Sequence, residues 1–302
     1  MKYAVNYHHK FRHIKDVDEI IIQYTSNIMT FVPELIGENK EKRIILDLVT
    51  EDKEDIPNII PFINKLRQDG YNIAVEISNT SDIIEIFRKD KIPYFFNWYA
   101  NNLEIATIQC EMGVSDIYVT EELGFRIKDL EYLKSKYNVK IRIFPNIAQS
   151  RNNTYVNALQ RFWVRPEDTE IYEPYVDVFE ILSGDDASRL SVIYEIYKNR
   201  QWLGNLNDII LDFKAPIINN RGMNPHFAEM RLNCGKKCLL GKCNLCNQMG
   251  EMSNSFVEVG LEVIKKKFKP EQSEQEIEEK INKLKERAHE PGTNENSNNI
   301  TS

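Results

Sequence analysis

Short apolar segments alternate along the first 213 residues with longer segments in which apolar side chains recur at helical spacing. The short segments are rich in β-branched and aromatic residues and are bounded by turn residues, which is typical of buried strands. Most of them end at or near a polar residue, so the pattern repeats one unit. These segments comprise KYAVNY and the runs around Asp47, Glu76, Asn97, Thr120, Asn146, Arg165, Glu180 and Asp212.

Apolar stripes with helical spacing lie between these segments, and they begin at Val17, Ile59, Leu103, Leu130 and Leu190. Alternation of strand and helix predicts a parallel sheet that is covered by helices. Eight or nine repeats favour closure into a (β/α)8 TIM-barrel-like fold, with an open doubly wound sheet as the alternative. No Gly-x-Gly-x-x-Gly motif follows the first strand, which argues against a dinucleotide-binding sheet.

The composition changes after residue 213 and divides the chain into three parts. We expect a barrel over residues 1–213, a cysteine-cluster segment with a docking helix over 214–268, and a charged tail over 269–302. The middle part is rich in Gly, Asn and Cys and has little periodicity, so we expect a bound ion or cluster to organise it. The tail is predicted to be helical and then disordered, because its last residues are polar.

Overall composition indicates a soluble globular protein, with 42% hydrophobic and 28% charged residues. No apolar run approaches the roughly 18 residues of a membrane span, and no secretory signal opens the chain. We therefore expect a cytoplasmic protein without a membrane partner. The net charge of −7 argues against broad nucleic-acid binding but leaves room for RNA binding by a local basic patch.

Polar residues at strand ends are the candidate site residues, because active sites of (β/α)8 barrels lie at the carboxyl ends of the strands. Arg165 would hold an anionic or carbonyl group by a forked interaction. Glutamates in a partly desolvated pocket would act as acid or base. The alternative for each residue is a loop cap or an ion pair. The candidate catalytic residues are Glu76, Arg165, Glu167 and Glu180, and Asn97 and Asn146 are candidates for substrate binding.

Four of the five cysteines lie close together, with the spacing C-x3-C-x4-C-x2-C: Cys234, Cys238, Cys243 and Cys246. In a reducing compartment, such thiols are more often metal ligands than disulfides. Four thiolates suit either Zn²⁺ or a [4Fe–4S] cluster, and the spacing alone leaves both open. Cys110 lies apart on the apolar face of a predicted helix, where we expect a buried structural thiol.

Five motifs follow one another in an order that resembles the collagenase-like peptidase family of barrel proteins: SDIYVTEELGF, IRIFPNIAQSRNN, QRFWVRPED, VDVFEIL, and NRG before the cysteine cluster. The resemblance implies that Asn146 and Gln149 line a substrate pocket and that Arg165, Glu167 and Glu180 occupy functional positions. The family includes oxygen-independent hydroxylases of ubiquinone precursors and of tRNA or rRNA. Characterised members bind [4Fe–4S] through four cysteines, so the resemblance favours iron–sulfur over zinc.

These observations lead to one main expectation and two alternatives. The main expectation is an iron–sulfur-dependent enzyme that hydroxylates or modifies a small molecule or RNA beside the barrel mouth. The first alternative is a non-enzymatic scaffold, whose structural metal site and charged tail bind a protein partner or a related barrel subunit. The second alternative is a peptidase, although the sequence contains neither Gly-x-Ser-x-Gly nor His-Glu-x-x-His.

Overall fold

The computed structural model divides the chain into two compact units. The barrel unit comprises Met1–Pro145 and Pro166–Arg200, and the second unit comprises Asn146–Arg165 and Gln201–Ser302. Within these spans the structure describes residues 2–7, 16–24, 37, 39–49, 54–78, 81–148, 155–184, 188–213, 217–232, 245–246 and 248–252.

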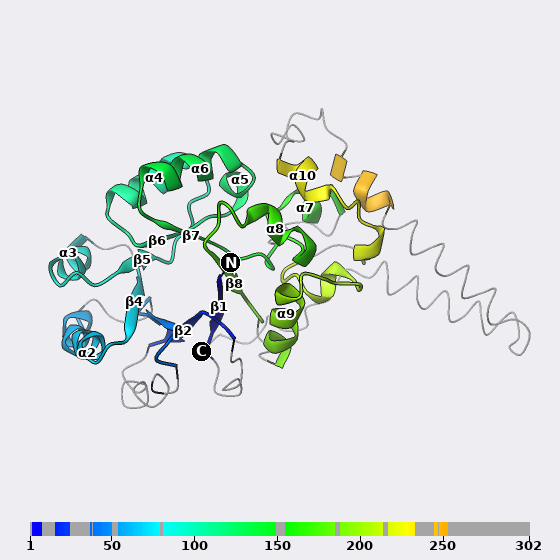
Figure 1. The fold of residues 1–302 in the computed structure, drawn as a ribbon. Coiled ribbons are helices and arrows are strands. Elements are labelled where there is room, and N and C mark those ends of the chain that lie inside the picture. Colours follow the sequence, from blue (N-terminus) through cyan, green and yellow to red (C-terminus); the bar gives the residue numbers. More distant parts are fainter. Residues whose placement is uncertain are drawn as a thin grey trace, which may run out of the picture. The chain divides into compact units, whose positions relative to one another are not determined.

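Eight parallel strands form the centre of the barrel unit within the described residues (Figure 1). Their order is β5-β4-β3-β2-β1-β8-β7-β6, so the last strand in sequence pairs with the first, as a (β/α)8 barrel requires. The strands are β1 (Lys2–Asn6), β2 (Glu19–Gln23), β3 (Arg43–Asp47), β4 (Asn72–Ile77), β5 (Tyr94–Phe96), β6 (Asp116–Tyr118), β7 (Lys140–Ile143) and β8 (Val178–Ile181).

Backbone contacts join β5 and β6, the two ends of this strand order. The Ser115 N–H donates to the carbonyl of Tyr94 at 2.8 Å, and the Ala100 N–H donates to the carbonyl of Tyr118 at 2.7 Å. Ala100 and Val119 also form a parallel bridge. The strands therefore form a nearly closed barrel, and the predicted (β/α)8 fold class is confirmed.

Helices lie outside the strands of the barrel unit (Figure 1). The stripes that begin at Ile59, Leu103, Leu130 and Leu190 fall in α2, α4, α6 and α9, as predicted. None of the described helices has the length and hydrophobicity that a bilayer crossing needs. The helices of this unit are α2 (Ile56–Gln68), α3 (Ser81–Lys89), α4 (Leu103–Glu111), α5 (Glu121–Gly124), α6 (Ile127–Lys136), α8 (Thr169–Tyr172) and α9 (Ser188–Lys198).

The stripe that begins at Val17 predicts a helix, but this prediction is wrong because Glu19–Gln23 forms strand β2. Its residues Ile20, Ile21 and Ile22 are all buried. A short apolar run that is buried on both faces has no alternation, so periodicity alone does not separate it from a helix. Its β-branched side chains favour the strand.

The strands predicted around Arg165 and Asp212 are also wrong. Pro166 follows Arg165 directly and begins a 3₁₀ turn, Pro166–Asp168, because proline supplies no N–H for a strand ladder. Asp212 has φ of 55°, which an extended strand excludes. Leu211 forms only an isolated parallel bridge, with Ile147. In the described part of the chain the barrel therefore has eight strands, but they are not the predicted set, because β2 is a strand and the runs around Arg165 and Asp212 are not.

The second unit has its own aromatic core. Trp163 is fully buried; its ring packs edge-to-face on Phe213, with 5.5 Å between centroids, and lies tilted against Phe227 at 5.7 Å. The guanidinium of Arg231 lies 4.7 Å from the centroid of the Trp163 ring, and its Nη1 donates to the Trp163 carbonyl at 2.9 Å. The helices of this unit include α7 (Tyr155–Gln160) and α10 (Phe227–Leu232).

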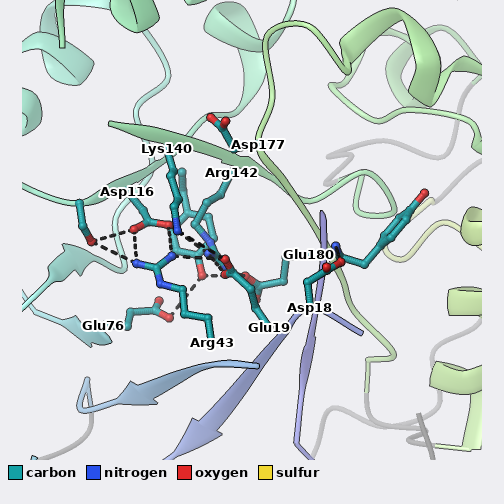
Figure 2. Close-up of polar contacts among 12 residues, drawn as sticks. Asp18, Glu19, Arg43, Glu76, Asp116, Lys140, Arg142, Asp177 and Glu180 are labelled. Carbon is teal, nitrogen blue, oxygen red and sulfur yellow. Dashed lines mark hydrogen bonds and ion pairs between the residues drawn. The ribbon is translucent and has the colours of Figure 1, made fainter. Parts of the chain in front are cut away.

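Charged side chains fill the amino-terminal end of the barrel interior, and we call them the basal cluster: Glu19, Arg43, Asp116, Lys140 and Arg142 (Figure 2). Arg43 donates two hydrogen bonds to Asp116, at 2.7 and 2.6 Å. Arg142 Nη1 donates to Glu19 at 2.5 Å and to Asp116 at 3.2 Å. Lys140 Nζ lies 3.8 Å from Glu19. Buried charges persist only when opposite charges compensate them, and this cluster supplies both signs.

Replacing Asp116 tests this compensation. Although burial opposes it, Arg43 holds the pKa of Asp116 well below its usual range, so the carboxylate is charged at neutral pH. The Asp116→Asn variant leaves Arg43 and Arg142 with too little negative charge, and we expect a loss of about 3–5 kcal/mol in the free energy of unfolding. Urea unfolding at neutral pH measures it.

The matched control is Asp16→Asn, which removes an ion pair with Lys198 at the protein surface. Exposed pairs contribute little, so the loss should stay under about 1 kcal/mol. Equal losses in the two variants would contradict a stabilising role for the basal cluster.

Candidate active site

Three side chains near the carboxyl ends of the strands share hydrogen bonds, and we call them the acid–tyrosine chain: Glu76 of β4, Tyr118 of β6 and Glu180 of β8. The hydroxyl of Tyr118 lies 2.8 Å from Glu180 Oε2 and 3.3 Å from Glu76 Oε2. Tyr118 is the last residue of its strand, and Glu76 is the last but one. Their contacts place all three side chains inside the barrel, near the end where sites of this fold lie.

The Tyr118 hydroxyl has a single hydrogen to donate to the two carboxyls beside it. A tyrosine hydroxyl donates one hydrogen and accepts others. The Tyr118 hydroxyl lies within donating distance of both carboxyls, and Glu180 is the nearer acceptor for its one hydrogen. Burial, together with the charges of Glu180 and Asp47, raises the pKa of Glu76 to about 8. Glu76 is therefore a neutral acid near pH 7, which is the range in which a carboxyl serves as acid or base.

Glu180 is buried and accepts a second hydrogen bond, from Arg142 Nη2 at 3.2 Å. Burial raises the pKa of Glu180 above its usual value, and the charge of Arg142 and the hydrogen bonds from Tyr118 and Arg142 offset part of this rise. Two carboxyls of the same site thus have different surroundings. Of the two carboxyls, Glu180 is the one in contact with a cation, and this contact favours the charged form of Glu180.

An aromatic wall lies next to the acid–tyrosine chain. The Tyr118 ring stacks on Phe144 with 4.8 Å between centroids, and Tyr99 packs edge-to-face on Tyr118 at 5.9 Å and on Phe144 at 5.7 Å. Tyr99 is 49% exposed and is the solvent-facing member of the wall. Burial of its hydroxyl and the charges of Glu180 and Glu76 raise the pKa of Tyr99. A ligand at this end of the barrel would therefore meet a neutral tyrosine beside the acids.

The structure brings two of the predicted catalytic residues together, Glu76 and Glu180. Asn97 follows β5 directly and is half-buried, with its N–H donated to the Ile77 carbonyl at 3.2 Å. Glu167 lies in the 3₁₀ turn after Arg165 and is not a member of the acid–tyrosine chain. The strand ends thus hold the candidate site, but not every polar residue there belongs to it.

Asn146 and Arg165 belong to the second unit. Asn146 is buried and its side-chain amide donates to the Ile209 carbonyl at 3.4 Å. Arg165 donates from Nη2 to the Pro225 carbonyl at 3.2 Å, and its guanidinium lies 5.8 Å from the centroid of Phe227. Both side chains thus contact groups of their own unit. Gln149 lies outside the described residues.

The cysteine cluster is described only at Cys246, which is half-buried in the second unit, since Cys234, Cys238 and Cys243 lie outside the described residues. Among the residues that the structure does describe, no group of three or more His, Cys, Asp or Glu side chains is arranged to hold a metal ion. Cys110 is buried on α4, as predicted, and burial raises the pKa of its thiol to about 11.

Sequence reasoning missed Tyr118 and Arg142. The signal for Arg142 is a charged residue inside an apolar strand, KIRI, where a buried position demands a partner. Tyr118 and Arg142 are in register on neighbouring strands, so their side chains point to the same side of the sheet. That pairing depends on the fold and is not visible in the order of residues alone.

Comparisons with known proteins yield a structural likeness and no sequence relative. No family model and no curated protein matches the sequence. Among solved structures, a match is the U32 peptidase Mk0906, with 13% sequence identity and a TM-score of 0.39. The match covers 61% of this chain and 93% of that chain.

Removing the Glu76 carboxyl should change how stability depends on pH. With its pKa raised to about 8, folded Glu76 holds a proton that the unfolded chain releases above about pH 4.5. The free energy of unfolding therefore falls as the pH rises from about 5 to 8. The Glu76→Gln variant has no proton to release at this position, so its free energy of unfolding should not fall in this way. The difference in free energy of unfolding between variant and wild type should therefore rise from about pH 5 to pH 8 by at least ~1.4 kcal/mol, which corresponds to one pKa unit.

Urea unfolding at both ends of the interval measures this change. Glu85→Gln, an exposed position on α3, is the control and should track the wild type. If Glu76→Gln and wild type kept a constant difference in stability, Glu76 would not hold a proton at neutral pH.

Proposed function

We propose that the protein is a barrel enzyme that transfers a proton to or from its substrate at the carboxyl ends of the strands, with Glu76 as the acid. The observation that carries this proposal is the contact of Tyr118 with Glu76 and Glu180 at 3.3 and 2.8 Å. A protonated carboxyl beside a tyrosine and a charged carboxylate is the arrangement that separates acid from base.

Each member of the acid–tyrosine chain has a role in this proposal. Glu76 donates its proton to the bound substrate and becomes a carboxylate. Tyr118 keeps Glu76 in position, since its hydroxyl accepts from the neutral acid and donates to the charged one. Glu180 stays charged, and its repulsion favours return of a proton to Glu76 after reaction. Tyr99 and Phe144 exclude water from one side of the site, which strengthens these interactions.

We also propose that a four-thiolate centre accompanies this site, held by Cys234, Cys238, Cys243 and Cys246. The donor set suits both Zn²⁺ and [4Fe–4S], and the motif resemblance supports the cluster. Such a centre supplies electron transfer or polarisation of a substrate when it is bound. The same resemblance supports oxygen-independent hydroxylation, or another modification of a small molecule or RNA, in the cytoplasm.

Metal analysis of the anaerobically purified protein tests the centre. We expect iron and a coloured absorbance spectrum, with metal content that falls by more than half in Cys243→Ala, because a four-ligand site loses one of its ligands. Cys110→Ala is the matched control and should retain its metal, since that thiol is buried on α4. A colourless, zinc-loaded protein would rule out electron transfer by an iron–sulfur cluster. Unchanged metal content in Cys243→Ala would refute the assignment of the four cysteines as ligands.

Product formation tests the acid role. The anaerobic protein is incubated with fractionated metabolites or small RNAs and an added electron acceptor, because hydroxylation with water as the oxygen source releases two electrons. Mass spectrometry follows the gain of an oxygen atom or another group. Loss of a general acid typically costs 10²–10⁴-fold in rate, so Glu76→Gln should slow the reaction by at least about 10²-fold. Glu85→Gln should react like wild type. Equal rates in both variants would contradict the role of Glu76, and no product from any fraction would favour the scaffold alternative.

A further inference from the structure

We infer that Arg142 is a positioning residue, which keeps Glu180 charged and thereby places the proton shared by the two carboxyls on Glu76. The inference rests on the proposed function, because it explains why Glu76 and not Glu180 is the acid. It names a residue that sequence reasoning did not select. Arg142 lies inside β7 and is fully buried (Figure 2). It is in register with Tyr118 of β6.

Arg142 links the basal cluster to the acid–tyrosine chain. Nη1 donates to Glu19 at 2.5 Å and to Asp116 at 3.2 Å, while Nη2 donates to Glu180 at 3.2 Å. The rings of Phe95 and Tyr118 lie 5.2 and 5.5 Å from the guanidinium carbon. A planar guanidinium that is held at both ends and covered by rings has one orientation, so its charge stays at a fixed distance from Glu180.

Among the described residues, the charge balance inside the barrel leaves no cation for Glu76 or for Asp47, its in-register neighbour on β3. Arg43, Lys140 and Arg142 oppose Glu19, Asp116 and Glu180, three charges against three. Within the described residues, no ion pair includes Glu76. A carboxylate without a cation is costly in a desolvated interior, so Glu76 keeps its proton.

Every strand around the two acids fits this assignment. Next to Glu76 and Glu180, the in-register neighbours on β5 and β1 are Phe95 and Ala4, which carry no charge. The other groups that face the pair are Glu19 of β2, Asp47 of β3, Tyr118 of β6, Arg142 of β7, and Tyr99 after β5. Among these facing groups, Arg142 is the cation that contacts either acid, and it contacts Glu180.

The direction of the hydrogen bonds also supports a proton on Glu76. With the proton on Glu76, donation runs from Glu76 to Tyr118 and from Tyr118 to Glu180, which also accepts from Arg142. With the proton on Glu180, a neutral acid would face a guanidinium, which has donors but no acceptor. Tyr118 would then turn its hydrogen toward Glu76, although its shorter contact is with Glu180. Arg142 therefore favours the first arrangement.

Infrared spectroscopy of the full chain without substrate locates the proton, since a neutral carboxyl has its own C=O stretching band. At pH 7 we expect one such band from the interior in wild type and its loss in Glu76→Gln. The band should return in Glu76→Gln/Arg142→Met, because Glu180 then lacks its cation and takes up a proton. It should stay absent in Glu76→Gln/Arg142→Lys, where a positive charge is retained.

Three outcomes would overturn the inference: a band that persists in Glu76→Gln and disappears in Glu180→Gln, a band that does not return in the folded Arg142→Met double variant, or one that returns equally with lysine. Circular dichroism checks folding, and Arg142→Gln replaces Arg142→Met if the latter does not fold. Because no substrate is present, a protein that places the proton as inferred but forms no product would refute the proposed function alone.

Discussion

The guanidinium of Arg142 in the barrel interior is the interaction on which the rest of the structure depends. Interiors of (β/α)8 barrels are usually filled with layers of branched apolar side chains. In this barrel charged side chains replace part of these layers, and each charge has to be compensated in a desolvated space. Arg142 donates to Glu19, Asp116 and Glu180, and so joins both ends of this interior. The packing of the barrel and the charge of the site therefore share one side chain.

Much of the barrel can be predicted from the sequence, because alternating strand and helix patterns are local. Four of the helical stripes, such as Ile59 to Leu66 in α2, face the core as their spacing requires. Glu76 and Glu180 can be selected because charged residues near the carboxyl ends of apolar strands have few roles other than pairing or chemistry. The sequence is sufficient to predict an element or a site residue where a single short segment determines it.

The remaining features depend on contacts between distant segments. The sequence of β2 has the pattern of a helix because Ile20, Ile21 and Ile22 are all buried, a property set by the helices and strands around them. Arg165 has the position of a strand-end residue but contacts Pro225 and Phe227, about 60 residues further along the chain. Tyr118 and Glu180 meet only when β6 and β8 lie on either side of β7. No spacing in the sequence specifies these encounters.

The chain passes between the two units three times, after Pro145, after Arg165 and after Arg200. A single cut consequently releases neither unit whole. Cutting after Arg200 would leave Asn146–Arg165 attached to the barrel without Leu211 and Arg231, which bridge to Ile147 and bond to Trp163. Recombination that replaces the segment after Arg200 with a segment of another protein would thus disrupt both units.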